Sequence, residues 1–120
     1  MPVESCDLLC VDLPHAEAVR AGLLGMDDLE LPAARAKALS DPRRLRVALA
    51  LQAGDEMCVC DLAWVCEDSR NLVSHHVRVL RSTGLARSRR EGKLVMYELT
   101  PVGQLLLDAV TDGRPAAVEA

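Results

Sequence analysis

Two helical segments joined by a short polar turn constrain the fold of this chain more than any other stretch. The first is expected from about residue 57 or 58 to residue 66, and the turn covers residues 67–70. The second runs from about residue 71 to residue 83, where Gly84 ends it. A helix, a tight turn and a helix of this length predict a unit that binds DNA.

The second segment has a polar face and an apolar face when successive residues are placed about 100° apart. The polar face consists of Asn71, Ser74, His75, Arg78 and Ser82. The other face consists of Leu72, Val73, His76, Val77 and Leu80, and we expect it in the core. We predict that the residues approaching base edges or nearby phosphates are Arg70, Asn71, Ser74, His75 and Arg78.

The remaining elements predict a winged helix-turn-helix. Helices are expected over residues 15–24 and 27–39, and a third begins at Asp41-Pro42 and ends at Gly54. Strands are expected over residues 85–90 and 93–99, around the hairpin signal Glu91-Gly92. Thr100-Pro101 begins a last helix that is apolar on more than one side, so it has to be buried in its own domain and on a partner. The predicted class is mainly α with a small β-hairpin, in a dimer.

Length and composition agree with this division. The 120 residues are half apolar but almost without aromatic side chains, so the core must be Leu, Val and Ala, which suits packed helices. A chain this small buries a modest share of its surface alone, so a dimer would help it. We predict an N-terminal arm with a short helix (residues 1–26), a DNA-binding and dimerisation domain (27–112) and a flexible tail (113–120).

Charge is distributed unevenly along the chain. The net charge of −4 by itself argues against a nucleic-acid partner, but the acidic residues dominate the first third and basic residues dominate from Arg70 to Glu98. A local basic face is what phosphate contact requires. The basic side chains expected to hold the DNA backbone from the hairpin are Arg87, Arg89, Arg90 and Lys93.

The start of the chain and its cysteines indicate a cytoplasmic protein. Residues 1–4 read Met-Pro-Val-Glu, without the basic start and apolar run of a signal peptide, and no stretch predicts a membrane span. Thiols stay reduced in the cytoplasm, so the five cysteines indicate metal or redox chemistry rather than a disulfide framework.

With these elements in place, the chain resembles the ArsR/SmtB family of dimeric metal-responsive repressors. The resemblance is carried by residues 38–44, 58–62, 74–80 and 84–97. Cys-x₃-Cys at residues 6–10 together with Cys-Val-Cys at residues 58–60 is closest to the cadmium-, lead- and zinc-sensing CadC branch. The resemblance implies a homodimer that binds a pseudo-palindromic double-stranded operator when metal-free and leaves it on binding metal. It implies that the ligands are Cys6, Cys10, Cys58 and Cys60, with the arm of one subunit reaching the other.

The chemistry of four thiolates fits cadmium, lead or zinc, because soft ligands select soft ions. Cys58 and Cys60 cannot share a face inside a regular helix, since two residues turn it by about 200°. At a helix end or in an extended lead-in, their sulfurs can converge. The alternative is that both are buried apolar side chains, and for Cys66 we expect that role. Whether Cys10 is an essential ligand stays open.

The sequence also bears on several other functions. Arsenic sensors of this family carry a third cysteine where this chain has Ala63, although Cys58, Cys60 and an arm cysteine could still bind arsenic(III). The family's second zinc site, on the last helix, is not expected because no His follows residue 100. A thiol-redox repressor and a DNA-binding protein with structural zinc share the same fold. A thiol enzyme is not expected, because no outward Cys–His pair lies on a catalytic motif.

Overall fold

A computed structural model describes residues 10–112 of the chain. Its contacts divide the chain into two compact units, Met1–Glu30 and Leu31–Ala120. The first contains α1 (Leu13–Gly22) and the 3₁₀ turn η3 (Met26–Leu29), and it buries none of its described residues. Between residues 10 and 112, no helix is long and apolar enough to cross a membrane.

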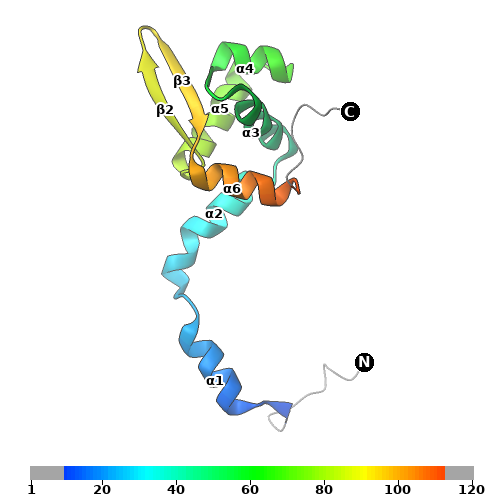
Figure 1. Cartoon of the computed structure of the whole chain (residues 1–120), viewed down its shortest axis with the longest axis vertical. Helices are drawn as coiled ribbons and strands as arrows, with labels where there is room; N and C mark the ends of the chain where they lie inside the picture. Colours follow the sequence, from blue (N-terminus) through cyan, green and yellow to red (C-terminus); the bar gives the residue numbers. More distant parts are fainter. Residues whose placement is uncertain (1–9, 113–120) are drawn as a thin grey trace. The chain divides into compact units, whose positions relative to one another are not determined.

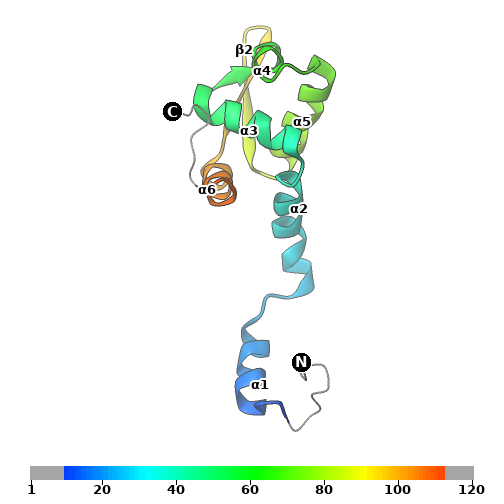
Figure 2. The ribbon, with the colours of Figure 1, turned by 90° about the vertical axis from the view of Figure 1, so that its right-hand side faces the viewer.

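The second unit is mainly helical with a small antiparallel sheet, as predicted (Figure 1). Its elements in order are α2 (Glu30–Ala38), α3 (Pro42–Gly54), β1 (Met57–Cys58), α4 (Val59–Cys66), α5 (Arg70–Ser82), β2 (Ala86–Glu91), β3 (Leu94–Leu99) and α6 (Pro101–Val110). The sheet has the order β1-β3-β2. A view from the side shows α3 passing between α5 and α6, and α3 packs against both (Figure 2).

Side-chain caps set the starts of three helices. The Asp41 carboxylate accepts hydrogen bonds from the backbone N–H groups of Arg43 at 2.9 Å and Arg44 at 3.4 Å, and Pro42 follows the cap, as predicted. The hydroxyl of Ser69 accepts from Leu72 N at the start of α5. Thr100 does the same for Gly103 at the start of α6. These caps fix where α3, α5 and α6 begin.

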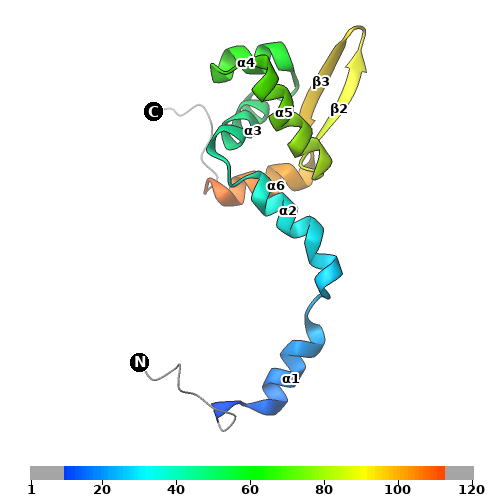
Figure 3. The same ribbon diagram turned by 180° about the vertical axis from the view of Figure 1, so that it is seen from behind.

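Every helix of the second unit except α2 contributes fully buried aliphatic side chains to the core. The largest fully buried side chains are Val47, Leu51, Leu62, Val73, Val77, Leu80, Leu85 and Leu107. Seen from behind, α4 and α5 lie together beside the β2–β3 hairpin (Figure 3). The core thus holds the helix-turn-helix and the hairpin in one body.

Some predicted boundaries were wrong. The helix expected from residue 57 or 58 begins at Val59, because Met57 and Cys58 pair as a strand with Tyr97 and Met96 of β3. The helix expected over residues 27–39 is divided into η3 and α2. The helix α3 includes Gly54, and the positive φ that ends it, +65°, is at Asp55, the next residue.

Candidate functional site

The outer face of α5 carries the polar residues that the sequence assigned to DNA. Asn71, His75 and Arg78 are exposed and Ser74 is half-buried. Arg78 Nη1 donates to Ser74 Oγ at 3.1 Å, which holds the two side chains together on this face. Four of the five residues expected in the core are buried on the other side. Leu72 is the exception, with 42% of its surface exposed, because it lies at the edge of that face, about 90° around the helix from its centre.

His76 is packed inside the unit, as expected. Its side chain is 4% exposed, and its Nδ1 lies 3.1 Å from Nη1 of Arg44. Arginine can only donate, so Nδ1 accepts and the hydrogen is on Nε2. Burial and then the neighbouring Arg44 charge lower the pKa of His76. The neutral ring therefore links α5 to α3 through its hydrogen bond with Arg44.

The four basic side chains of the hairpin fall into two groups, those that form ion pairs and those that do not among the described residues. Arg87 Nε donates to Glu98 at 2.8 Å, and Arg89 forms a bidentate pair with Glu56 at 2.6 and 2.7 Å. The Arg89 hydrogen bond holds the pKa of Glu56 below its usual value. Arg90 and Lys93 are exposed, and they form no ion pair with any residue from 10 to 112. The sequence did not reveal Glu56 as a partner, because it lies 33 residues from Arg89.

Cys58 and Cys60 lie on either side of the start of α4. Cys58 ends β1 in an extended conformation, at φ −88° and ψ 168°, and is 8% exposed. Cys60 lies in the first turn of α4 and is exposed. The pair therefore lies at a helix end, the arrangement in which two sulfurs can converge. The burial of Cys58 also agrees with the alternative, in which it is a buried apolar side chain.

The other cysteines are placed differently. Cys66 is buried at the end of α4, as expected, and burial raises the pKa of its thiol. Cys10 is exposed and belongs to the first unit. Cys6 lies outside the described residues. Among residues 10–112, no group of three or more His, Cys, Asp or Glu side chains is arranged to hold a metal ion. Thiols are ligands that soft metal ions prefer, and the second unit places two of them at the start of α4, Cys58 buried and Cys60 exposed.

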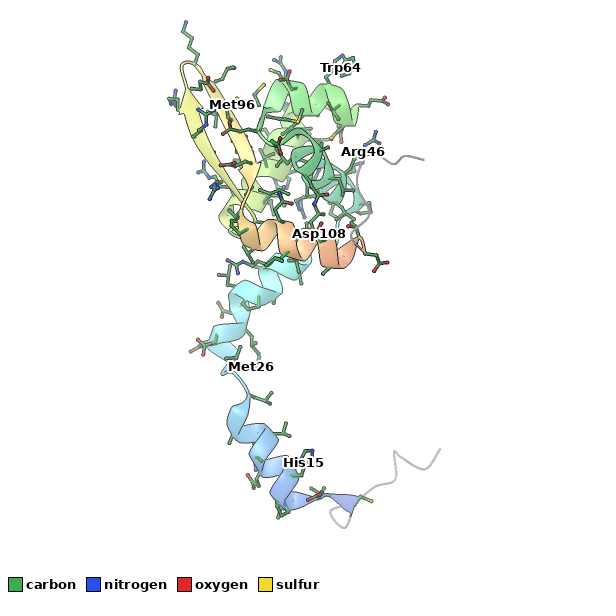
Figure 4. All side chains as sticks on the ribbon, in the orientation of Figure 1. His15, Met26, Arg46, Trp64, Met96 and Asp108 are labelled. Atoms are coloured by element: carbon green, nitrogen blue, oxygen red, sulfur yellow. The ribbon has the colours of Figure 1, made fainter. Side chains whose placement is uncertain are left out.

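The first turn of α4 also contacts the start of α5. Arg70 Nη1 donates to Cys60 Sγ at 3.6 Å, and both side chains are exposed. The sequence predicted Cys60 as a metal ligand and Arg70 as a DNA contact. Their separation of ten residues along the chain did not indicate that they would contact each other. One turn along α4 from Cys60, Trp64 points away from the unit with 83% of its surface exposed (Figure 4).

The last helix leaves an apolar face uncovered. Leu107 is buried, but Leu105 is 71% exposed and Val110 is 49% exposed. Between α2 and α6 lies an open groove of about 320 Å³. Its lining residues are Pro32, Arg35, Val102, Leu105, Leu106 and Ala109.

Known proteins resemble this chain in sequence and in fold. Residues 41–88 match the family described as bacterial regulatory protein, arsR family. A cadmium resistance transcriptional regulatory protein CadC homolog of Staphylococcus aureus is 49% identical over 83 residues, which cover 68% of this chain and 69% of that protein. A transcriptional repressor SmtB homolog of Synechocystis is 42% identical over 94 residues, covering 78% and 70%.

A solved structure agrees with the fold. The homodimeric winged helix-turn-helix DNA-binding domain Mb0332 of Mycobacterium bovis, a possible ArsR-family transcriptional regulator, superposes with a TM-score of 0.66 at 29% identity. The match covers 77% of this chain and 87% of that domain. The predicted winged helix-turn-helix is thereby confirmed.

Proposed function

The chain belongs to the ArsR/SmtB family of bacterial transcriptional repressors, and we propose that it is a homodimer whose hold on operator DNA is released by a soft metal ion. Its family and fold are those of DNA-binding regulators, not of enzymes. We propose that it works in the cytoplasm, where bacterial DNA lies, and that its release allows transcription of metal efflux or resistance genes.

The DNA-binding part of the proposal assigns α5 to the major groove of a pseudo-palindromic duplex. Arg70, Asn71, Ser74, His75 and Arg78 would meet base edges and nearby phosphates. From the hairpin, Arg87, Arg89, Arg90 and Lys93 would contact the backbone. The ion pairs of Arg87 and Arg89 reduce the charge they offer, so Arg90 and Lys93 should contribute most of the phosphate attraction.

The sensing part of the proposal assigns the ion to Cys58 and Cys60, completed by Cys6 and Cys10 from the arm of the other subunit. The observation that carries it is the exposed thiol of Cys60 beside the buried thiol of Cys58 at the start of α4. Cadmium or lead is the proposed inducer, and zinc is a third candidate. The CadC homolog of S. aureus is named for cadmium resistance, which supports this order.

The dimer in the proposal is held by α6. Its exposed Leu105 and the apolar groove beside it offer a face that a second copy would cover. An apolar helix face of this kind is costly to leave in water, and covering it would bury the helix on both sides.

A cadmium titration of the reduced full-length chain tests the sensor. Ultraviolet sulfur-to-cadmium absorption would report ligation, and binding to a duplex of the protein's own upstream DNA would report release. We expect the absorption to saturate near one ion per subunit as DNA binding is lost. Cys60→Ser should bind DNA normally but should not be released. Cys66→Ala is the matched control and should respond like the wild type.

Other outcomes separate the alternatives. Release by peroxide without metal, reversed by a reductant, would favour a thiol-redox repressor. Stronger release by arsenite than by cadmium would favour an arsenic(III) sensor built on three sulfurs. Unfolding on chelation would point to structural zinc. DNA binding that ignores bound cadmium would refute the proposal while leaving the fold in place.

A further inference from the structure

The contact between Cys60 and Arg70 joins the two proposed activities of the protein. Cys60 stands in the first turn of α4, and Arg70 is the first residue of α5, directly after the Ser69 cap. Arg70 Nη1 donates to Cys60 Sγ at 3.6 Å, and the residue is exposed at the start of the helix that is proposed to meet DNA.

The chemistry of this contact changes when the sulfur binds a metal. A thiol is a weak acceptor, so it holds a guanidinium loosely. A coordinating thiol is deprotonated outright, and several thiolates around one divalent ion carry net negative charge. Hydrogen bonds between ionised groups are about twice as strong as neutral ones. Metal binding therefore turns Cys60 from a weak partner of Arg70 into a strong one.

A DNA phosphate competes for the same guanidinium. Arginine has five N–H donors in a fixed fork, and a phosphate is among its best partners. The side chain is exposed at the helix start, so it can turn to either partner without rearranging the core.

We propose that Arg70 couples the metal site to DNA binding by exchanging a phosphate of the operator for the metal-bound sulfur of Cys60. This inference rests on the proposed function and names the residue that carries its regulation. In the metal-free dimer each Arg70 holds a phosphate. With metal bound, each guanidinium turns to its own subunit's sulfur, and one phosphate contact per subunit is lost.

The test compares Arg70→Met with Arg78→Met in the full-length protein. Both changes remove one positive charge from the exposed face of α5, but Arg78 donates to Ser74 and not to Cys60. The release factor is the ratio of DNA affinities without and with cadmium. We expect Arg70→Met to lower it about 100-fold for the dimer, about tenfold from each subunit, which is the lower end of what one hydrogen bond to a charged group contributes. Arg78→Met should weaken both states alike and keep the wild-type ratio.

Salt dependence gives a second measurement. Each phosphate contact contributes about 0.9 to the slope of log affinity against log salt. Cadmium should make the wild-type slope shallower by about 1.8, one contact from each subunit. In Arg70→Met the slope should be the same with and without cadmium.

A third measurement needs no DNA, so it holds even if Arg70→Met binds too weakly to assay. Cadmium should slow the exchange of the Arg70 guanidinium protons in nitrogen-15 NMR spectra of the free protein, with Arg70→Met assigning the signal. Unchanged exchange, or a wild-type release factor in Arg70→Met, would overturn the inference. So would loss of the sulfur-to-cadmium absorption in that variant, since Arg70 would then support metal binding itself. A wild type that cadmium fails to release would instead refute the proposed function.

Discussion

The imidazole of His76 is buried, and only one of its two nitrogens has a hydrogen-bond partner among the described residues. Nδ1 accepts from Arg44, while Nε2 has no hydrogen-bond partner among the described residues. Protonation would put an N–H on Nδ1 against the Arg44 guanidinium, so that two donors would face each other. The charged groups nearest to it, besides Arg44, are His75, Asp41 and Asp68.

A pH dependence of stability follows from the lowered pKa of His76. Below its ordinary value of 6.5, the unfolded chain binds a proton that the folded chain refuses. The free energy of unfolding should therefore fall as pH drops from 7.5 to 5.5, above the range where Asp41 and Glu56 titrate. Urea unfolding at the two pH values measures this. His76→Gln should flatten the difference, and His75→Gln, on the exposed face, should change it much less.

Single residues of the site were predictable where one helix decided their position. The 100° pattern correctly placed Asn71, His75 and Arg78 outside and His76 inside. It was wrong for Leu72, because a face of a helix is buried only where another element covers it. The contact of Arg70 with Cys60 and that of Arg89 with Glu56 depend on how separate elements pack, which local periodicity does not describe.

Among the elements, β1 was the one that the sequence did not predict. A strand of two residues has no alternating pattern of its own, and it exists here because β3, about 40 residues later, supplies its hydrogen-bonding partner. Its pairing of Cys58 with Met96 ties one candidate ligand to the hairpin, while the neighbouring Cys60 contacts α5. The start of α4 is thus connected to both elements that are proposed to meet DNA.

The close packing of α6 on the chain before β2 makes a prediction about Gly103. A Cβ at this position would overlap the backbone carbonyl oxygen of Leu85, which also accepts from Thr100 N at 3.0 Å. Alanine normally favours a helix over glycine by up to about 1 kcal/mol. Here we expect Gly103→Ala to destabilise the fold by roughly 1–3 kcal/mol, as overpacking does.

Thermal unfolding would measure the effect, with Gly54→Ala as the matched control. A Cβ at Gly54 would meet the side chain of Met57, which is flexible and can move aside. We expect the control to change the unfolding temperature much less. A Gly103→Ala protein as stable as the wild type would mean that α6 does not pack this closely.

For the molecule as a whole, the exposed face of α6 predicts that assembly depends on Leu105. Leu105→Glu puts a charge on a side chain that is 71% exposed, so the single subunit should still fold. At the centre of a dimer interface the same charge should raise the dissociation constant about 100-fold, and operator affinity should fall with it. Sedimentation analysis measures this directly. Leu94→Glu, at an exposed position of the hairpin, should remain dimeric.

The sequence predicted the architecture of the second unit well, because capped helices, a turn signal and alternating faces are local features. It predicted a DNA-binding region from the basic stretch after Arg70, despite the net charge of −4. The metal site is a different case. Its proposed ligands lie in two separate units, with Cys58 and Cys60 in one and the arm in the other, and no local sequence pattern relates positions so far apart in the chain.

The exposed indole of Trp64 gives this protein an optical probe of its own. It is the chain's single tryptophan, and it stands one helical turn from Cys60 on the same side of α4. Indole emission in water lies at long wavelength and shifts to shorter wavelength when the ring is covered. Tryptophan fluorescence therefore reports on one place in the chain, beside Cys60, a proposed metal ligand. Arrival of an ion or of a neighbouring segment at that spot can be timed without attaching any dye.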